Sequence, residues 1–417
     1  MKETDVLIIG AGLAGLSAAI HLQRKKLKVQ ILEADQRVGG RLKTDLVEGF
    51  RLDRGFQVLL TGYPEAQKIL DYDALNLQLF RAGSLVLWEG GKFEIGDPFR
   101  NPLSLFSTML SPSGTLTDKL RILWLRNMLS KEPIEQLFER SELPTYQVLP
   151  EYGFSPKIIN LFFRPFFSGI FLENDLISSR RMFDFVFKMF AEGDTAVPAL
   201  GMEEIPKQLL TKLEPGTVLL HKKVKSIDSG KVTTEEGEEF AAKAILIATA
   251  APDLASGYLK AKTLKKQSVT CVYFQTHKTP FKKPMVILNA WKDHFVNNLC
   301  VMSEVSPFYA PQGKSLISVS FNGLSELSDS DLSAKIRNEL SIWFGDDVYA
   351  WRMLKKYPIV YALPNQVSVV DHISADQIRK QEGIYLAGDY LLNGSIHGAL
   401  KSGRLAAMLI AQDLGYM

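Results

Sequence analysis

The sequence is poor in cysteine and carries little net charge. Only two cysteines, Cys271 and Cys300, occur in 417 residues, and they form no metal-binding spacing. So few cysteines suit a reducing compartment, where a chain of this length needs no disulfides. The formal charge of +3 is small and the charged residues are interspersed, so we expect no nucleic-acid partner. The six histidines show no clustering, and we predict no metal site.

Long apolar runs are also absent. No window reaches the roughly 20 consecutive apolar residues that a membrane-spanning helix needs. The first residues, MKETDVLIIGAG, lack the cationic leader and the cleavage site of a signal peptide. We therefore expect a cytoplasmic protein and leave peripheral contact with a membrane surface open. The sequence leaves the oligomeric state open as well.

One stretch near the N-terminus has the pattern of a complete βαβ unit, DVLIIGAGLAGLSAAIHLQRKKLKVQILEAD. It predicts a buried strand at residues 6–9, a helix after it and a second strand at residues 29–32. The turn between strand and helix reads G-x-G-x-x-G, where glycine allows a tight turn, close approach of a pyrophosphate and close helix packing. Glu33 is placed to accept a hydrogen bond from a ribose hydroxyl. The predicted dinucleotide contacts are Gly10, Ala11, Gly12, Leu13, Ala14, Gly15, Glu33 and Ala34.

The segment after Glu33 favours a flavin over a nicotinamide cofactor. It reads EADQRVGGRLKTDLVEGFRLDRGFQVL and contains Gly39, Gly40 and Arg41, with Asp53 and Gly55 further on. In this order the sequence resembles the flavin amine oxidase superfamily, which includes protoporphyrinogen oxidases and carotenoid desaturases. Paired glycines beside an arginine suit a phosphate that backbone and guanidinium both approach. The resemblance implies FAD as the cofactor, and NAD is the alternative.

Later segments extend the resemblance. TVLLHKKVKSID and KVTTEEGEEFAAKAILIATA look like the family's adenine-side element, which implies contacts from the backbone of Val224 and from Ala250. VPALGMEEIPKQL is similar to the family's Pro-x-Gly-Gly-Met stretch, with Leu200 where the first glycine is usual.

GDYLLNGSIHGALKSGR resembles the C-terminal motif of carotenoid desaturase-like members. The resemblance implies that Asp389 contacts the ribityl chain or the pyrophosphate, and that the backbone N–H of Ile396 faces the flavin's pyrimidine edge. The other residues assigned to the cofactor in this way are Gly55, Phe56, Gly388, Ser395 and Ala399. Neither cysteine lies near this motif, so we expect FAD to be bound non-covalently.

The fold class expected from these motifs is α/β. The resemblance implies a Rossmann-type FAD-binding domain made of residues 1–80, 198–265 and 366–417. This domain is interleaved with an α+β substrate domain made of residues 81–197 and 266–365. The first insert looks mostly helical, and the second alternates like strands, as in SVTCVYFQ and KSLISVSF. The sequence alone permits other interleavings.

The first insert is rich in phenylalanine. Ten occur within a short stretch: Phe154, Phe162, Phe163, Phe166, Phe167, Phe171, Phe183, Phe185, Phe187 and Phe190. Aromatic residues at helical spacing are more often core than pocket, but we expect some of these to line an apolar substrate cavity at the domain junction. Arg164, Arg180 and Arg181 suit lipid headgroups if an apolar small-molecule substrate comes from a membrane, and ordinary surface charge is the alternative.

The chemistry follows from the expected cofactor. A flavin accepts a hydride at N5, so the protein has to orient a C–H bond and exclude solvent. Two features of amine-oxidising members are missing, because Thr270 or a neighbour stands at the lysine position and Ser395 at an aromatic-cage position. We predict dehydrogenation of a hydrophobic small molecule, with carbon–carbon desaturation favoured. The alternatives are amine oxidation at an atypical site and a flavin-containing isomerase or binding protein. His397 is a candidate acid or base.

Overall fold

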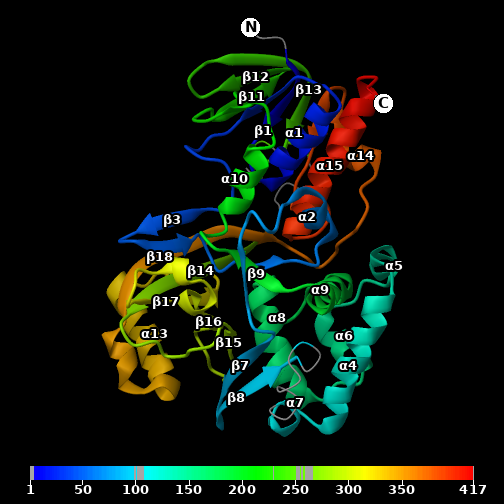
Figure 1. Ribbon diagram of the computed structural model, residues 1–417. Helices are drawn as coiled ribbons and strands as arrows, with labels where there is room; N and C mark the ends of the chain where they lie inside the picture. Colours follow the sequence, from blue (N-terminus) through cyan, green and yellow to red (C-terminus); the bar gives the residue numbers. More distant parts are fainter. Residues whose placement is uncertain are drawn as a thin grey trace.

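A mainly parallel sheet forms the part of the molecule that contains both chain ends (Figure 1). The structure is a computed structural model and describes residues 4–97, 100, 108–228, 230–249, 254, 257–258 and 266–416. The strands of this first sheet run in the order β10-β2-β1-β13-β12-β11, and β20 pairs with β13 and β19. Their bounds are β1 Thr4–Ile9, β2 Val29–Leu32, β10 Val218–Leu219, β11 Val224–Asp228, β12 Lys231–Thr234, β13 Glu239–Ile247, β19 Arg379–Gln381 and β20 Ile384–Leu386.

Two helices from opposite ends of the sequence pack together on this sheet. They are α1 (Leu13–Arg24) and α15 (Ile396–Asp413), which lie side by side in Figure 1. Close contact requires glycine, because a Cβ on Gly403 of α15 would lie 2.2 Å from the carbonyl oxygen of Ala14. The Ser17 hydroxyl also donates a hydrogen bond to the carbonyl oxygen of Leu400 (2.8 Å). The C-terminal helix therefore packs directly against α1 and covers the first sheet together with it. The expected Rossmann-type βαβ unit is present at residues 4–32.

A second sheet of seven strands lies at the other end of the molecule, in the order β18-β14-β17-β16-β15-β7-β8. Its bounds are β7 Gly83–Trp88, β8 Gly91–Gly96, β14 Lys266–Thr276, β15 Val286–Asn289, β16 Asn298–Val301, β17 Ser315–Asn322 and β18 Arg352–Pro364. Helix α13 (Asp329–Phe344) covers one face, where Leu85 and Leu87 are in its core. Val86 packs on the opposite face with Phe162 and Phe166, as the alternation of a strand requires.

The helices of the first insert form a layer beside the second sheet (Figure 1). They are α4 Leu116–Lys131, α5 Ile134–Glu139, α6 Thr145–Glu151, α7 Pro156–Ile158, η1 Ile159–Phe163, α8 Arg164–Phe171 and α9 Arg180–Glu192. The segments expected to be helical near residues 117–128 and 156–167 lie in this layer. The insert is less helical than expected, because β7 and β8 supply two strands to the second sheet.

The remaining elements are short. Two small sheets contain β3 Thr44–Val47 with β4 Phe50–Asp53, and β5 Leu59–Leu60, β9 Thr195–Pro198 and β6 Leu77–Leu79. The other helices are α2 Pro64–Ile69, α10 Glu204–Leu210, α12 Met302–Val305, α14 Ala375–Ile378, η2 Pro307–Tyr309, η3 Gly345–Ala350 and η4 Asp389–Leu391. Within the described part of the chain, no helix is both long and apolar enough to cross a membrane.

The strands of the first sheet come from three separated stretches, and those of the second sheet from residues 83–96 and 266–364. This placement agrees with a discontinuous cofactor domain. The domain boundaries themselves stay a prediction.

Candidate active site

Four parallel strands of the first sheet end side by side. Ile9 of β1 lies level with Leu32 of β2 and Ile247 of β13, which in turn lies level with Leu386 of β20. The segments that follow therefore emerge at the carboxyl ends of these strands, and they carry the glycine-rich turn, Glu33 and the C-terminal motif. Ligands of open α/β sheets bind outside the carboxyl ends of the strands, at the point where the strand order reverses. That point is β1, which has β2 on one side and β13 on the other.

The three glycines of the turn have different surroundings. Gly10 has a φ of +102°, and Gly15 lies so close to it that a Cβ on Gly15 would meet the Gly10 carbonyl oxygen at 2.0 Å. Gly12 begins α1, and a Cβ there would meet no protein atom within 4 Å. Gly10 and Gly15 therefore serve the fold, whereas Gly12 borders open space at a helix N-terminus whose first N–H groups can bind a phosphate.

Glu33 is held at the end of β2 with its carboxylate facing the glycine-rich turn. One oxygen accepts a hydrogen bond from the backbone N–H of Ala11 (2.7 Å), and the other accepts from the backbone N–H of Asp35 (2.9 Å). The segment before β11 runs beside it, because the N–H of Lys222 donates to the Glu33 carbonyl oxygen (2.8 Å). Val224, the buried first residue of β11, follows Lys222 by two residues, so the start of β11 lies near the acidic residue. Ala34 is exposed, and Ala250 lies outside the described residues.

The loop with the paired glycines covers the start of α1. A Cβ on Gly40 would lie 3.3 Å from the Cα of Gly12, and the N–H of Gly39 donates to the carbonyl oxygen of Ala11 (2.9 Å). Arg41 then reaches the C-terminal motif, where its guanidinium pairs with the Asp389 carboxylate (2.7 Å). Burial lowers the pKa of Arg41, but the charge of Asp389 outweighs burial and the pKa is raised. Two sequence motifs far apart in the chain therefore meet.

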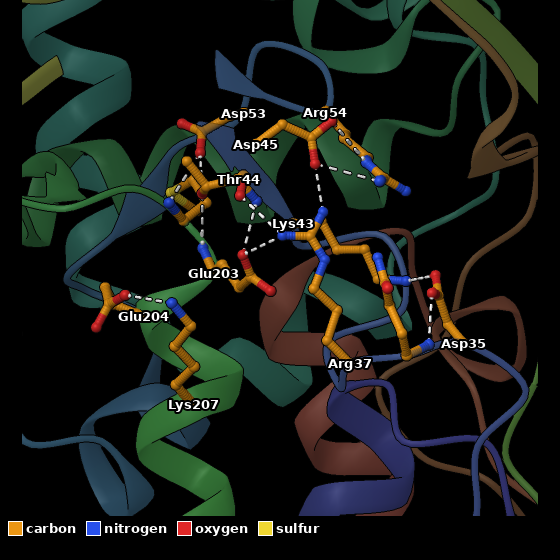
Figure 2. Close-up of polar contacts among 12 residues, drawn as sticks. Asp35, Arg37, Lys43, Thr44, Asp45, Asp53, Arg54, Glu203, Glu204 and Lys207 are labelled. Carbon is orange, nitrogen blue, oxygen red and sulfur yellow. Dashed lines mark hydrogen bonds and ion pairs between the residues drawn. The ribbon is translucent and has the colours of Figure 1, made fainter. Parts of the chain in front are cut away.

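Ion pairs fix both ends of this loop (Figure 2). At the start, Arg37 pairs with Glu203 (2.9 Å) at the beginning of α10 and with Asp45 of β3. At the end, Lys43 pairs with Asp35, which is next but one to Glu33. The guanidinium of Arg41 is therefore carried on a segment with little freedom to move.

Asp53 joins this network to the second sheet. Its carboxylate accepts hydrogen bonds from the Thr44 hydroxyl (2.5 Å), the Tyr309 hydroxyl (2.7 Å) and the N–H of Met202 (2.9 Å). Burial raises the pKa of Asp53 to about 6, although these hydrogen bonds oppose the rise. Gly55 follows with a φ of +99°, and a Cβ there would lie 2.7 Å from the side chain of Ile359 in β18. These residues position the hairpin β3–β4 between the two sheets.

The C-terminal motif forms a tight turn into α15. The N–H of Gly388 donates to the Ser402 hydroxyl (3.0 Å), and Asp389 opens η4. Ser395 is the N-cap of α15, since its hydroxyl oxygen accepts from the N–H of Gly398 (2.8 Å). The resemblance places an aromatic ring of amine-oxidising members at the position of Ser395. Here the Ser395 side chain caps the helix instead. Ile396 is the first helical residue, and Ala399 is buried one turn later.

His397 points into the protein core. Its Nδ1 accepts a hydrogen bond from the N–H of Glu65 (3.4 Å), and its ring lies against Phe185 (centroids 5.2 Å apart) and Tyr63 (6.0 Å). Burial, followed by the charge of Lys401, lowers the pKa of His397 to about 3. The neighbours come from α2, α9 and α15, so this placement favours a packing role, and an acid–base role stays a prediction.

Several buried polar atoms around the Arg41–Asp389 pair have no hydrogen-bond partner among the described residues. They belong to Gln57, Tyr361, Gln366, Tyr390 and Asn393. The Arg41 guanidinium lies over the ring of Tyr361 (5.4 Å), and the Gln57 amide donates to the Arg41 carbonyl oxygen (3.2 Å). Unsatisfied buried polar groups are costly, so this group is typical of a site that a polar ligand completes. These five residues were not predicted from the sequence, although Tyr390 and Asn393 lie within GDYLLNGSIHGALKSGR.

A cavity of about 290 Å³ lies beside the segment that carries Gln57. Phe56 and Val58, the chain neighbours of Gln57, line it, and α4, α8, α9, β7 and β15 form its walls. Five of the ten insert phenylalanines line it: Phe162, Phe166, Phe167, Phe187 and Phe190. The other five, which are Phe154, Phe163, Phe171, Phe183 and Phe185, are buried outside its lining. Half of the ten insert phenylalanines therefore line the cavity, and the other half belong to the core alone.

A family model matches residues 13–411, and its description is flavin containing amine oxidoreductase. The chain belongs to this family. The match begins within the glycine-rich turn and covers the Arg41 loop and the C-terminal motif. The protein is an FAD-dependent oxidoreductase with the mixed α/β fold of the family.

The similar proteins include a phytoene desaturase and protoporphyrinogen oxidases, as well as amine oxidases. The chain is 23% identical to a 15-cis-phytoene desaturase of Glycine max over 99% of its own length and 80% of the desaturase. It is 26% identical to protoporphyrinogen oxidase 2 of Arabidopsis thaliana, over 39% of this chain and 32% of that protein. The fold resembles the solved structure of a putative protoporphyrinogen oxidase from Exiguobacterium, with a TM-score of 0.73, 19% identity and full coverage of both chains.

The described residues of the flavoprotein fit FAD. Open space at Gly12, the guanidinium of Arg41 and the unsatisfied polar atoms near Asp389 offer donors and acceptors along one continuous edge. When bound, FAD supplies an acceptor for a hydride. Among the residues that the structure describes, no group of three or more His, Cys, Asp or Glu could hold a metal ion.

Thr270, which the resemblance places at or next to a lysine of amine-oxidising members, carries no cation. Thr270 is buried in β14 and its hydroxyl donates to the carbonyl oxygen of Gly323 (2.9 Å). Lys278 is exposed and pairs with Asp347. Lys119, the lysine in the cavity lining, donates to the carbonyl oxygens of Met109 (2.6 Å) and Ser111 (2.9 Å).

Proposed function

We propose that the enzyme dehydrogenates an apolar small molecule in this cavity and forms a carbon–carbon double bond. The observation that carries the proposal is an aromatic cavity next to the segment that contacts the Arg41 loop. Gln57 contacts the Arg41 loop, while its neighbours Phe56 and Val58 line the cavity. A substrate held there has one end beside the predicted flavin position.

In this proposal the protein acts by orientation and exclusion of water. Bound FAD would supply the acceptor for a hydride from one carbon, and a proton from the adjacent carbon would pass to water outside the cavity, which leaves a double bond between the two carbons. Aromatic and aliphatic walls orient the chain without strong acids or bases. The absence of a lysine at Thr270 and of an aromatic ring at Ser395 disfavours amine oxidation.

Arg81 favours a second candidate, a carboxylate-bearing substrate such as a porphyrinogen. It lines the cavity next to Phe80, whose ring contacts Phe56 (6.3 Å). Among the described residues, the Arg81 side chain has no hydrogen-bond or ion-pair partner. The other arginines of the lining are paired, since Arg126 binds Asp97 (2.9 Å) and Arg100 binds Asp194 (2.8 Å). A carboxylate in an apolar cavity would gain most from the one guanidinium without such a partner.

Anaerobic mixing of the purified holoenzyme with donors tests the proposal. We expect a carotenoid precursor or a porphyrinogen to bleach the flavin absorbance, and amines to leave it unchanged. The variant Arg81→Leu separates the two candidates, because it raises KM tenfold or more for a carboxylated donor and leaves a hydrocarbon donor unaffected. Bleaching by amines alone would contradict the proposal, and a bound flavin that no donor reduces would favour an isomerase or binding protein. Release of intact FAD on denaturation tests non-covalent binding.

A further inference from the structure

Helix α4 exposes apolar side chains on its outer surface. Leu116, Leu120 and Trp124 are 55%, 58% and 50% exposed, and their spacing of four residues places them on one face. The opposite face is buried through Leu125 and Leu129. Such a helix leaves an apolar stripe that no described part of the protein covers.

The stripe continues onto the segment before α4. Met109 is 46% exposed and Leu110 is 84% exposed. The ammonium of Lys119 holds this segment to the helix through the carbonyl oxygens of Met109 and Ser111. We call these five exposed apolar residues, Met109, Leu110, Leu116, Leu120 and Trp124, the α4 patch.

The α4 patch is also the rim of the substrate cavity. Met109, Leu116 and Leu120 line the cavity and are exposed to solvent at the same time. The same cavity is also lined by Phe56, the chain neighbour of Gln57. It therefore gives the outer surface an apolar path toward the segment that contacts the Arg41 loop. Exposed apolar patches of this kind mark interaction surfaces.

The exposed charge of α4 itself is positive. The helix carries Arg121 and Lys131, together with Lys119, which is buried, and Arg126, which pairs with Asp97 (2.9 Å), and its one acid is Asp118. The carboxylate of Asp118 is buried in hydrogen bonds with Thr115 and Ser155, so it adds no exposed negative charge. Lys157 lies next to this region and is exposed. A positively charged helix with exposed leucine and tryptophan suits a bilayer that contains anionic lipids.

We propose that the α4 patch docks the enzyme on an anionic lipid bilayer, with the cavity opening toward the hydrocarbon. This inference rests on the proposed function, since it explains how an apolar substrate enters without crossing water. Trp124 suits the headgroup level because its ring is apolar with one polar N–H.

Arg164, Arg180 and Arg181, which also suit lipid headgroups, bind other groups of the protein instead. Arg180 donates to the Tyr152 hydroxyl (3.0 Å), and Arg181 pairs with Glu142 (3.3 Å). Arg164 donates to the carbonyl oxygen of Asn174 (2.8 Å). These contacts occupy the three guanidinium groups within the protein, so the docking surface is centred on α4.

Sedimentation of the holoenzyme with vesicles tests the docking surface. We expect binding to phosphatidylcholine vesicles that contain phosphatidylglycerol, and at least tenfold weaker binding of the variant Leu116→Gln/Leu120→Gln/Trp124→Gln. The matched control is Leu46→Gln/Ile342→Gln, whose parent residues are as exposed but lie in β3 and α13. The control should bind like the wild type. Arg121→Gln/Lys157→Gln should weaken binding to anionic vesicles about fivefold for each charge removed.

Two results would overturn the inference. One is equal vesicle binding by the wild type and the triple variant. The other is a wild-type dimer, seen by light scattering, that the triple variant loses without any vesicle binding, because a second copy would then cover the patch. Vesicle binding with no bleaching by any donor would retain the docking surface and reject the proposed function. The flavin content of each variant, measured first, confirms that it has folded.

Discussion

The strand ends that carry the glycine turn and the Arg41–Asp389 pair, here called the cofactor edge, and the aromatic cavity are built from opposite kinds of residue. At the cofactor edge each position has its own stereochemical reason, as with Gly15, which has no room for a Cβ, and Arg41, which pairs with Asp389. In the cavity many phenylalanines share one task, and neighbours such as Phe166 and Phe190 contact one another (5.2 Å). Removing one group abolishes a directional contact completely. Removing part of an apolar side chain costs binding or stability only in proportion to the apolar area that is lost.

This difference predicts sharp effects at the edge and graded effects in the cavity. Substitutions at the edge should remove FAD binding almost completely. Substitutions in the cavity should change KM or stability according to the area and the volume removed. The four predictions below test this contrast, from the largest expected effect to the smallest.

The pair Gly15→Ala and Gly12→Ala separates the fold from the ligand. Alanine usually stabilises a helix by about 1 kcal/mol relative to glycine. At Gly15, however, the Cβ would lie 2.0 Å from the Gly10 carbonyl oxygen, so we expect loss of soluble, flavin-containing protein. At Gly12 the new methyl group meets no protein atom, so the apoprotein should keep its melting temperature and lose at least tenfold in FAD affinity. Wild-type flavin content in Gly12→Ala would contradict this assignment.

Removing the charge of Arg41 tests the contact between the two distant motifs. Arg41→Gln and Asp389→Asn should each lower FAD affinity tenfold or more, as measured by titration of the apoprotein. The double variant should lose less than the sum of both effects, because the two groups act as a pair. Arg352→Gln is the control, since its ion pair with Glu48 is exposed on the surface. Additive losses would show that the two groups act independently.

Two phenylalanines of α9 test whether substitutions in the core and in the cavity have graded and different effects. Phe183 is fully buried and Phe187 lines the cavity, and their ring centroids are 5.8 Å apart. Phe183→Leu should lower the free energy of unfolding by about 1–3 kcal/mol and leave KM unchanged. Phe187→Leu should raise the substrate KM several-fold with a smaller loss of stability. Urea unfolding and steady-state kinetics measure both, and equal effects of the two substitutions would erase the distinction between core and cavity.

His397 tests whether an acid or base is needed at the boundary between the two regions. The unfolded chain binds a proton on histidine near pH 6.5, whereas the native ring binds it only near the lowered pKa of about 3. Acidification from about pH 6.5 to pH 5 therefore costs up to about 2 kcal/mol of stability through this residue. His397→Asn keeps an acceptor for the Glu65 N–H and should remove this acid sensitivity in urea titrations. The exposed His372→Asn serves as the control. A hundredfold loss of kcat/KM in His397→Asn would instead show proton transfer.

Local motifs allowed much of the cofactor edge to be predicted. The strands predicted at 6–9 and 29–32, the helix between them and the glycine turn follow from apolar runs and glycine spacing, which act within about thirty residues, and the structure begins the first strand at Thr4. The family was likewise recognisable from Gly39, Gly40, Arg41 and the C-terminal motif, and the family model confirms it. The individual contacts of these residues with FAD stay predictions.

Features that depend on distant packing could not be predicted. The sequence did not indicate that β7 and β8 join a sheet formed mainly by residues 266–364, because β-pairing between remote segments leaves no local pattern. Gln57, Tyr361 and Gln366 carry no motif of their own, and their unsatisfied polar atoms acquire meaning only beside Arg41 and Asp389.

The sequence by itself determined the family, the cofactor and the backbone turns that a dinucleotide requires, because glycine and an acidic residue at fixed spacing act through local geometry. Only the tertiary structure decided which phenylalanines form core and which form cavity, since both kinds have the same side chain and the same helical spacing. It also decided that His397 faces the core and that Leu116 and Leu120 face both solvent and the cavity. These are properties of surfaces made by segments far apart in the chain, and burial is fixed only when those segments pack.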